Sequence, residues 1–262
     1  MNIPEAVIAG AIQGIVEWLP VSSEAQTMLY MLNILKISPD TALSYAFFLH
    51  FGTMLAVVIK FRNEFFSVLK APFNKSELTP VLVFGTIFTA ITAIPLYFIL
   101  KNVSDMGNPA FFTLVIGFML ILTGIIMKFS GSKGDKEIAD VNKKDIFLTG
   151  IAQGFAIIPG ISRSGITVAM LLVRKVKQET ALTISFVLSA PATIGILFLD
   201  YSNLSRIPLQ SMFVLTLSSL FFGYISMDIL LKFAGKVSFW KFCIIFGLIT
   251  FIIVILGSFF SL

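Results

Sequence analysis

Two stretches of this chain carry the same residues 140 positions apart. The matching pairs are Gln13-Gly14 and Gln153-Gly154, Ser22 and Ser162, Thr27 and Thr167, and Thr53 and Thr193. Each copy places a proline, Pro20 or Pro159, inside an otherwise apolar run. In a lipid-embedded chain a proline breaks the helical hydrogen-bond ladder, and hydrocarbon offers the freed groups no partner. Neither run is therefore an ordinary spanning helix, and paired interruptions of this kind indicate a binding site between repeats.

The composition of the chain indicates a membrane protein. Of its 262 residues, 57% are hydrophobic and 13% are charged, and the mean hydropathy is +0.95. A soluble domain of this size cannot bury so much apolar surface. The single cysteine, Cys243, excludes a disulfide framework and a thiolate metal cluster. We therefore expect an integral membrane protein.

Apolar runs of about 20 residues predict the membrane-spanning helices. They lie at 41–60, 80–100, 110–128, 179–199, 210–231 and 240–260. The runs at 8–32 and 147–172 are apolar but interrupted. We expect one all-α membrane domain over residues 1–262, with six transmembrane helices and two re-entrant helical hairpins. The hairpins belong to an inverted-topology internal repeat, with repeat 1 at about 8–100 and repeat 2 at about 147–232. A connecting span at 110–128 and a C-terminal span at 240–260 complete the domain.

The distribution of basic residues decides between crossing segments and hairpins. Suppose first that both interrupted runs cross the membrane. The Lys and Arg residues outside the second run then divide 10 against 8 between the two faces of the membrane. If both are hairpins, the division is 15 against 3, with only Lys36, Lys101 and Arg206 on the minority face. The positive-inside rule then predicts that both termini lie outside and that the loops 61–79 and 129–146 are cytoplasmic. The net charge of +5 reflects this topology and not nucleic-acid binding.

The second hairpin carries an arginine between two serines, Ser162-Arg163-Ser164. An arginine within hydrocarbon costs at least ~2.5–3.5 kcal/mol, so Arg163 needs an anionic partner. The Pro-Gly break at 159–160 lets a helix begin near Ser162, and the free N–H groups of a helix start attract phosphate. The hydroxyl of Thr167 adds a further donor. Arg163 therefore either binds an anionic ligand or pairs with a glutamate and ties the two hairpins together.

The first hairpin supplies carboxylate and hydroxyl groups. Gln13 and Glu17 are four residues apart and share one helical face. A buried Glu17 requires a cation, which is either Arg163 or a divalent metal ion. Together with Ser22 and Ser23 these residues suit phosphoryl transfer, in which cations neutralise the phosphate and a serine or a water attacks. Glu24 follows directly, and it lies either in the site or beyond it at the membrane interface.

At these residues the chain resembles the undecaprenyl-diphosphatase family of the bacitracin-resistance type. The first family motif consists of a glutamate or glutamine, three further residues and a glutamate, and is followed by Pro-Val-Ser-Ser. It corresponds here to Gln13, Glu17 and residues 20–23. The second motif, Pro-Gly-x-Ser-Arg-Ser-Gly-x-Thr, matches residues 159–167 in full. The resemblance extends over essentially the whole chain, including 47–58 and 185–191.

The resemblance implies a six-span, two-hairpin fold in the cell membrane. It implies removal of the terminal phosphate from a C55-type polyprenyl diphosphate, which returns the monophosphate carrier to envelope glycan synthesis. A divalent cation, magnesium or calcium, is expected at Glu17 and Gln13. Ser23 or Ser22 is the expected nucleophile. The expected diphosphate ligands are Arg163, Gly160, Ser162, Ser164 and Thr167.

One departure from the family pattern concerns the proton acceptor. The common bacterial motif continues Ser-Ser-Thr-Gly-His, whereas this chain reads Ser-Ser-Glu-Ala-Gln, so Gln26 replaces the histidine. An amide accepts no proton at neutral pH. The role falls to another group, and the candidates are Glu17, Glu24 and His50, which is the only histidine of the chain.

Two functions of different classes are compatible with these residues. A polyprenyl-diphosphate phosphatase is favoured by Glu17 and the arginine-serine motif. A polyprenyl-phosphate transporter or flippase on the same inverted-repeat scaffold needs an anion site but no base, and so tolerates Gln26. The expected partners are a polyprenyl diphosphate lipid and the membrane, and no nucleic acid. A homodimer through the apolar helices is an open alternative.

Overall fold

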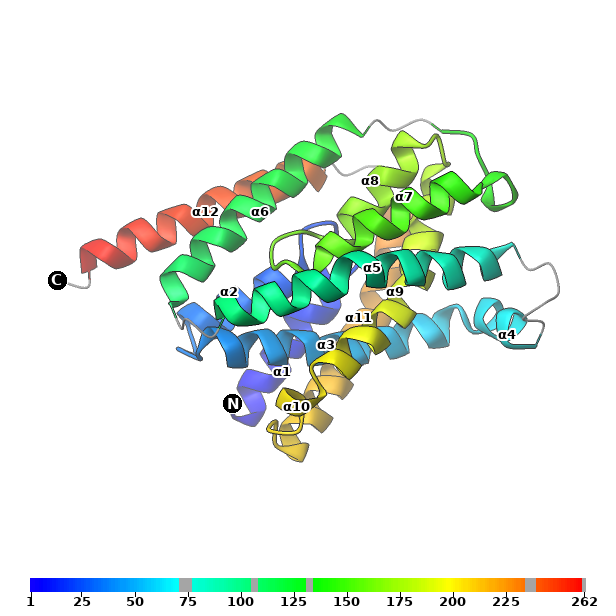
Figure 1. Cartoon of the computed structure of the whole chain (residues 1–262). Coiled ribbons are helices and arrows are strands. Elements are labelled where there is room, and N and C mark those ends of the chain that lie inside the picture. The colour runs from blue at the N-terminus through cyan, green and yellow to red at the C-terminus, as the bar shows by residue number, and fades with distance from the viewer. Residues whose placement is uncertain (71–76, 105–107, 131–133, 234–238, 261–262) are drawn as a thin grey trace.

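The computed structural model describes residues 1–70, 77–104, 108–130, 134–233 and 239–260. Each predicted span coincides with a long helix of this structure (Figure 1). These helices are α3 (Pro39–Lys60), α5 (Leu78–Ser104), α6 (Pro109–Phe129), α9 (Gln178–Leu199), α11 (Leu209–Phe233) and α12 (Phe239–Phe260). Within the described residues, five of them are long and apolar enough to cross a membrane, and α12 has a shorter described apolar stretch, Trp240–Ile252. The predicted all-α membrane fold is confirmed, while the count of six crossings stays a prediction.

Local signals in the sequence explain where the spans begin and end. Both α3 and α6 begin with a proline at the first helical position, where the missing N–H costs no hydrogen bond. The side chain of Asn108 also accepts a hydrogen bond from the N–H of Phe111 and caps α6. Both helices have a lysine in the last turn, Lys60 or Lys128, where the positive charge interacts favourably with the helix dipole. These two lysines lie on the face predicted to be cytoplasmic.

Each interrupted run forms two short helices joined by a turn. The first run gives α1 (Ile3–Val16) and α2 (Ser23–Asn33). The second gives α7 (Lys143–Gly154), the 3-10 turn η2 (Phe155–Ile157) and α8 (Arg163–Val173). The longest of these helices, α1, has 14 residues and so measures about 21 Å, which is less than the ~30 Å of a hydrocarbon core. No single arm is long enough to cross, and the re-entrant placement of both hairpins stays a prediction.

The first arm of each hairpin packs against a long helix of the other half of the chain, α1 on α11 and α7 on α5 (Figure 1). Glycines make this close approach possible. A Cβ atom on Gly14 would lie 2.5 Å from the backbone nitrogen of Gly223, and one on Gly150 would lie 2.7 Å from the carbonyl oxygen of Gly85. The two halves are therefore interlocked, although the repeat boundaries at 8–100 and 147–232 stay a prediction.

Two further helices hold the hairpin tips. Helices α6 and α12 lie side by side (Figure 1). Thr123 on α6 accepts a hydrogen bond from the N–H of Ser162 at 3.3 Å and donates one to the carbonyl oxygen of Gly160 at 3.2 Å. Cys243 on α12 donates from its Sγ to the carbonyl oxygen of Pro20 at 2.8 Å. The α6–α12 pair thus contacts both turns, and Cys243 is buried and free.

The predicted cytoplasmic loops contain short helices, α4 (Arg62–Lys70) and the 3-10 turn η1 (Ile138–Asp140). Residues 71–76 and 131–133 of these loops lie outside the described residues. On the opposite side, the loop that follows α9 contains the short helix α10 (Tyr201–Leu204). The orientation of the chain across the membrane stays a prediction.

Cysteine labelling tests this orientation. In a Cys243→Ser background, single cysteines replace Glu77, Lys143 and Ser205, which are all exposed. We expect an impermeant thiol reagent on intact cells to label only the cysteine at position 205, because the other two positions lie in the predicted cytoplasmic loops. Labelling of either loop cysteine in intact cells would show that the orientation is reversed or that the hairpins cross.

A buried aspartate fastens the second hairpin to the loop that precedes it. The Asp145 carboxylate accepts hydrogen bonds from Arg174 Nε at 2.6 Å and from Lys136 Nζ at 3.0 Å. The backbone N–H of Asn142 donates to the same carboxylate at 3.1 Å. Burial alone would raise the pKa of Asp145, but these hydrogen bonds and the charge of Lys136 outweigh it and lower the pKa below its ordinary value.

Asp145→Asn should lower the free energy of unfolding by about 1.5–3 kcal/mol near neutral pH, because it removes charge-assisted hydrogen bonds. A lowered folded-state pKa gives stability that is present above the unfolded value of about 3.9 and is lost as the pH falls through the folded value. Thermal unfolding in detergent should show a constant difference from the parent between about pH 7 and 5 that shrinks below pH 3.9. Asp135→Asn, at an exposed position, is the control. A difference that persists unchanged in strong acid contradicts this account.

Candidate active site

The two hairpin tips meet. The N–H of Gly160 donates to Ser22 Oγ at 3.3 Å, and Ser164 Oγ donates to the carbonyl oxygen of Leu19 at 3.2 Å. The turns need unusual backbone conformations, with φ of 101° at Gly160 and 55° at Ser22. A Cβ atom on Gly160 would also lie 2.6 Å from the carbonyl oxygen of Ile116, so only glycine fits that turn. The tips of the two hairpins are therefore in direct contact.

The repeated residues of the two hairpins make the same local bonds. Ser22 Oγ accepts a hydrogen bond from the N–H of Ala25 and caps α2, and Ser162 Oγ accepts one from Gly165 and caps α8. One turn later, each repeated threonine donates to the carbonyl four residues before it, Thr27 at 3.1 Å and Thr167 at 2.7 Å. The first residues of both helices line one small cavity of about 30 Å³. Two helix N-termini, which attract anions, therefore flank the same space.

Glu17 is the centre of the hydrogen-bond network between the tips. Its Oε1 accepts a hydrogen bond from Arg163 Nη2 across the two hairpins. Its Oε2 accepts hydrogen bonds from Ser23 Oγ at 2.5 Å and from Gln13 Nε2 at 2.8 Å. His50 Nε2 lies 3.4 Å from the same oxygen. The structure thus brings together the predicted residues of the first hairpin, the arginine of the second and the single histidine.

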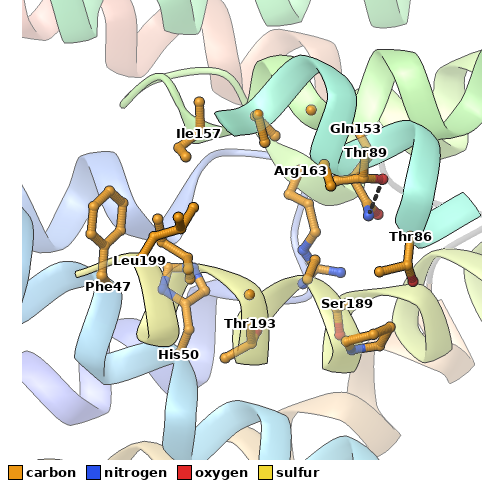
Figure 2. Close-up of a pocket in the computed structure, with 18 of the residues that line it drawn as sticks. Phe47, His50, Thr86, Thr89, Gln153, Ile157, Arg163, Ser189, Thr193 and Leu199 are labelled. Atoms are coloured by element: carbon orange, nitrogen blue, oxygen red, sulfur yellow. Dashed lines mark hydrogen bonds between the residues drawn. The ribbon is translucent and has the colours of Figure 1, made fainter. Parts of the chain in front are cut away.

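Arg163 ties the hairpins together and also faces a large cavity. Its Nη1 donates to the carbonyl oxygen of Ser185 at 3.0 Å, while its Nη2 reaches Glu17. A guanidinium has five N–H donors, so these two contacts leave donors for a ligand. Figure 2 shows the Arg163 side chain extending into a cavity of about 330 Å³, between His50 and Thr193 on one side and Thr89 on the other. The two alternatives drawn from the sequence are therefore compatible with each other.

The large cavity has a mostly apolar lining with a few polar groups. Its walls come mainly from α5 and α9, with contributions from α3, α2 and the second turn. The apolar lining includes Phe47, Ala93, Ile94, Ile157, Ile196 and Leu199. The polar lining includes Glu24, His50, Gln153, Arg163, Ser189 and Thr193 (Figure 2). Such a lining suits an amphiphile that combines a hydrocarbon chain with an anionic group.

The small cavity and the large cavity share part of their walls. The shared residues are Glu24, His50, Ala156 and Arg163. Ser23 and Glu17 line only the small cavity, whose 30 Å³ holds about two water molecules and no phosphate group. A phosphate that reaches Ser23 must therefore displace side chains at this boundary.

His50 is oriented by its own helix. Its Nδ1 lies 2.8 Å from the carbonyl oxygen of Ala46. A carbonyl only accepts hydrogen bonds, so Nδ1 carries the hydrogen and Nε2 is the nitrogen that faces Glu17. Gln26, which stands at the position of the family histidine, instead donates to the carbonyl oxygen of Val21 at 3.3 Å. His50, and not Gln26, faces the two cavities.

Sequence reasoning assigned no individual role to Ser185 or Gln153. Ser185 accepts from Arg163 through its carbonyl, and its hydroxyl lies 2.6 Å from Thr167 Oγ1. Gln153 donates to Thr89 Oγ1 at 3.0 Å (Figure 2). The sequence did mark both residues. Gln153 is the repeat partner of Gln13, and Ser185 is the first residue of the segment 185–191, which resembles the family. Neither signal reveals which partner the side chain finds.

Oxygen atoms suited to a hard cation are present, although not as a ready-made cluster. In the described part of the chain, no group of three or more His, Cys, Asp or Glu residues has metal-binding geometry. Gln13 Oε1 and Glu24 Oε1 are both buried and have no hydrogen-bond partner. Magnesium and calcium prefer carboxylate and amide oxygens, so these two atoms fit such an ion.

Comparison with known proteins agrees with the motifs. Residues 6–252 match the family model described as bacitracin resistance protein BacA. The chain is 44% identical to a protein of Methanothrix thermoacetophila named undecaprenyl-diphosphatase, over 95% of this chain and 96% of that protein. A protein of Methanopyrus kandleri with the same name is 35% identical over 92% of each chain. One of Bacillus thuringiensis subsp. konkukian, named undecaprenyl-diphosphatase 4, is 35% identical over 90% of each. These matches confirm the resemblance inferred from the two motifs.

Proposed function

Because this chain belongs to the bacitracin resistance protein BacA family, we propose that it hydrolyses a polyprenyl diphosphate of the undecaprenyl class to the monophosphate and inorganic phosphate. The name of its relatives supports this reaction and favours the phosphatase over the transporter. The observation that carries the proposal is the meeting of the two tips. It gathers a serine, a carboxylate and an arginine beside a mostly apolar cavity.

In the proposed complex, the hydrocarbon chain and the diphosphate occupy different parts of the cavity wall. The first isoprene units lie against the apolar side chains of α5 and α9, such as Ala93 and Ile196. The phosphates bind Arg163 and the N-terminus of α8, where Ser164 adds a hydroxyl. Arg163 is suited to this role because a guanidinium binds two phosphate oxygens at once.

Substrate binding requires movement at the boundary between the two cavities. The small cavity beside Ser23 has no room for a phosphate as it stands. Arg163 lines both cavities and keeps donors free while it is paired with Glu17, so it can bind a phosphate without leaving that carboxylate. We therefore expect the boundary between the cavities to widen when the diphosphate binds.

Ser23 is the proposed nucleophile. Its Oγ donates to Glu17 at 2.5 Å, whereas Ser22 Oγ already accepts two backbone N–H groups as a cap and a tip contact. Ser23 Oγ attacks the terminal phosphorus, the bond to the bridging oxygen breaks, and the lipid monophosphate leaves. Glu17 takes the serine proton and passes it to His50 Nε2. Water then hydrolyses the phosphoserine and releases inorganic phosphate.

A divalent cation is part of the proposal. Glu17 and Gln13 are the ligands expected from the resemblance, and the unpartnered Gln13 Oε1 supports a role for the glutamine. When bound, magnesium or calcium would neutralise charge on the diphosphate.

The proposed location is the plasma membrane, with both termini outside and the loops 61–79 and 129–146 in the cytoplasm. The basic residues of the predicted cytoplasmic face support this orientation. A homodimer through apolar helices remains a proposal, and large exposed apolar side chains on α12 such as Phe242 and Ile245 are compatible with it or with lipid contact.

The direct test is release of inorganic phosphate from a C55 diphosphate by the purified protein, with magnesium, with calcium and with a chelator. We expect release that depends on the cation. The absence of release under every metal condition, from protein that remains folded in detergent, would refute the phosphatase and return the transporter to consideration.

Replacing Arg163 tests the anion site. Arg163→Ala should abolish turnover, and Arg163→Lys should reduce it about 100-fold or more, because a lysine ammonium is a point charge that cannot make a planar two-point contact with phosphate. The measurement is kcat/KM for phosphate release at equal amounts of folded protein. A lysine variant with a near-normal rate would show that two-point contact is unnecessary.

Replacing His50 tests the proton acceptor. His50→Ala should lower kcat about 100-fold or more, the usual contribution of a general base, and added imidazole should restore part of the rate. Gln26→Ala is the matched control and should keep nearly the parent rate, since its described bond is to the backbone of the turn. Full activity of His50→Ala without imidazole would assign proton transfer to Glu17 alone.

A further inference from the structure

Glu24 is a buried carboxylate without a cation partner. The residue is 7% exposed, and its Oε1 has no hydrogen-bond partner. None of the ion pairs formed by described residues includes it. An unpaired carboxylate within a membrane protein is costly and marks a functional position.

Glu17 differs from Glu24 in this respect. Both oxygens of Glu17 are occupied, one by Arg163 and the other by Ser23 and Gln13. The Glu17–Arg163 pair is neutral as a unit, so a negative charge on Glu24 would have no partner among the described ion pairs. A cation entering this site finds an unoccupied Glu24 Oε1, whereas both oxygens of Glu17 already have partners.

Glu24 lies at the boundary between the two cavities, where the proposed diphosphate would bind. It lies in the first turn of α2, one residue after Ser23, and it lines both the large and the small cavity. Of the described residues, four line both cavities, and Glu24 is the acidic one among them. A diphosphate that bridges the two cavities therefore passes beside this carboxylate.

We propose that Glu24 is the protein's principal ligand for a divalent cation that binds together with the diphosphate. Magnesium is commonly held by one or two carboxylates together with phosphate oxygens and water, which is the ligand set available here. Two buried amide oxygens, Gln13 Oε1 and Gln153 Oε1, also have no partner, and Gln153 lines the large cavity with Glu24. This inference rests on the proposed function for the identity of the phosphate ligand, and it adds Glu24, a residue of α2, to the cation ligands Glu17 and Gln13 expected from the resemblance.

The test compares Glu24→Gln with the parent and with Glu179→Gln, an exposed control on α9. Binding of Mn²⁺ is measured by electron paramagnetic resonance, with and without a non-hydrolysable farnesyl methylenediphosphonate. The parent and the control should bind Mn²⁺ when the analogue is present. Each protein should also unfold at a higher temperature with Mn²⁺ and the analogue than without them. Glu24→Gln should bind Mn²⁺ at least 10-fold more weakly and lose this thermal shift.

The unfolding temperature in the absence of metal shows whether Glu24 is a cation ligand or a residue that stabilises the fold. Because Glu24 is unpaired, Glu24→Gln should unfold in chelator at the parent temperature or above it, whereas a structural carboxylate would lower that temperature when replaced. Should the glutamine variant fail to fold, the proposal is overturned unless Glu24→Asp, which keeps the charge, folds and retains a weaker Mn²⁺ response. Parent-like Mn²⁺ binding by Glu24→Gln also overturns it.

The outcomes distinguish this inference from the proposed function. If the parent binds Mn²⁺ and the analogue through Glu24 but releases no phosphate from a C55 diphosphate, the cation site is supported and the phosphatase is refuted. If the parent and Glu24→Gln release phosphate equally well at every magnesium concentration, the phosphatase is supported and the Glu24 site is refuted.

Discussion

The arrangement of this protein depends on the ion pair between Glu17 and Arg163. Either charge alone would be costly to bury, and pairing the two charges removes most of that cost only if the two hairpin tips meet. The proline turns, the positive φ at Gly160 and the contacts of α6 and α12 with the turns serve that requirement. A pair that holds the tips together and leaves arginine donors free gives the site both its rigidity and its affinity for anions.

The sequence predicted the framework because the bilayer permits few solutions. Runs long enough to cross hydrocarbon had to be helices, and the six long helices lie within a few residues of the predicted spans. Pro20 and Pro159 likewise identified the turns before the structure did. Pairing of Arg163 with a glutamate was one of two alternatives, and the structure shows that it leaves donors free for a ligand.

The partners of individual side chains could not be predicted, because they depend on packing between distant segments. Nothing in the apolar run around His50 shows that its ring faces Glu17, since that depends on how α3 crosses the first hairpin. Gln26 occupies the motif position yet bonds to the backbone of its own turn. The lack of a partner for Glu24 Oε1 likewise became evident only from the packing of the two hairpins. Periodicity shows which residues share a helix face but not what that face meets.

The interlocking of the two halves has a consequence for biosynthesis. Helix α1 packs on α11, which the ribosome produces near the end of the chain, and Glu17 pairs with an arginine 146 residues later. Until those segments have been synthesised, the Glu17 carboxylate has no arginine partner and the glycine face of α1 is uncovered. The first hairpin therefore reaches its final packing late in synthesis, and a chain truncated before α11 leaves that face open to non-native contacts.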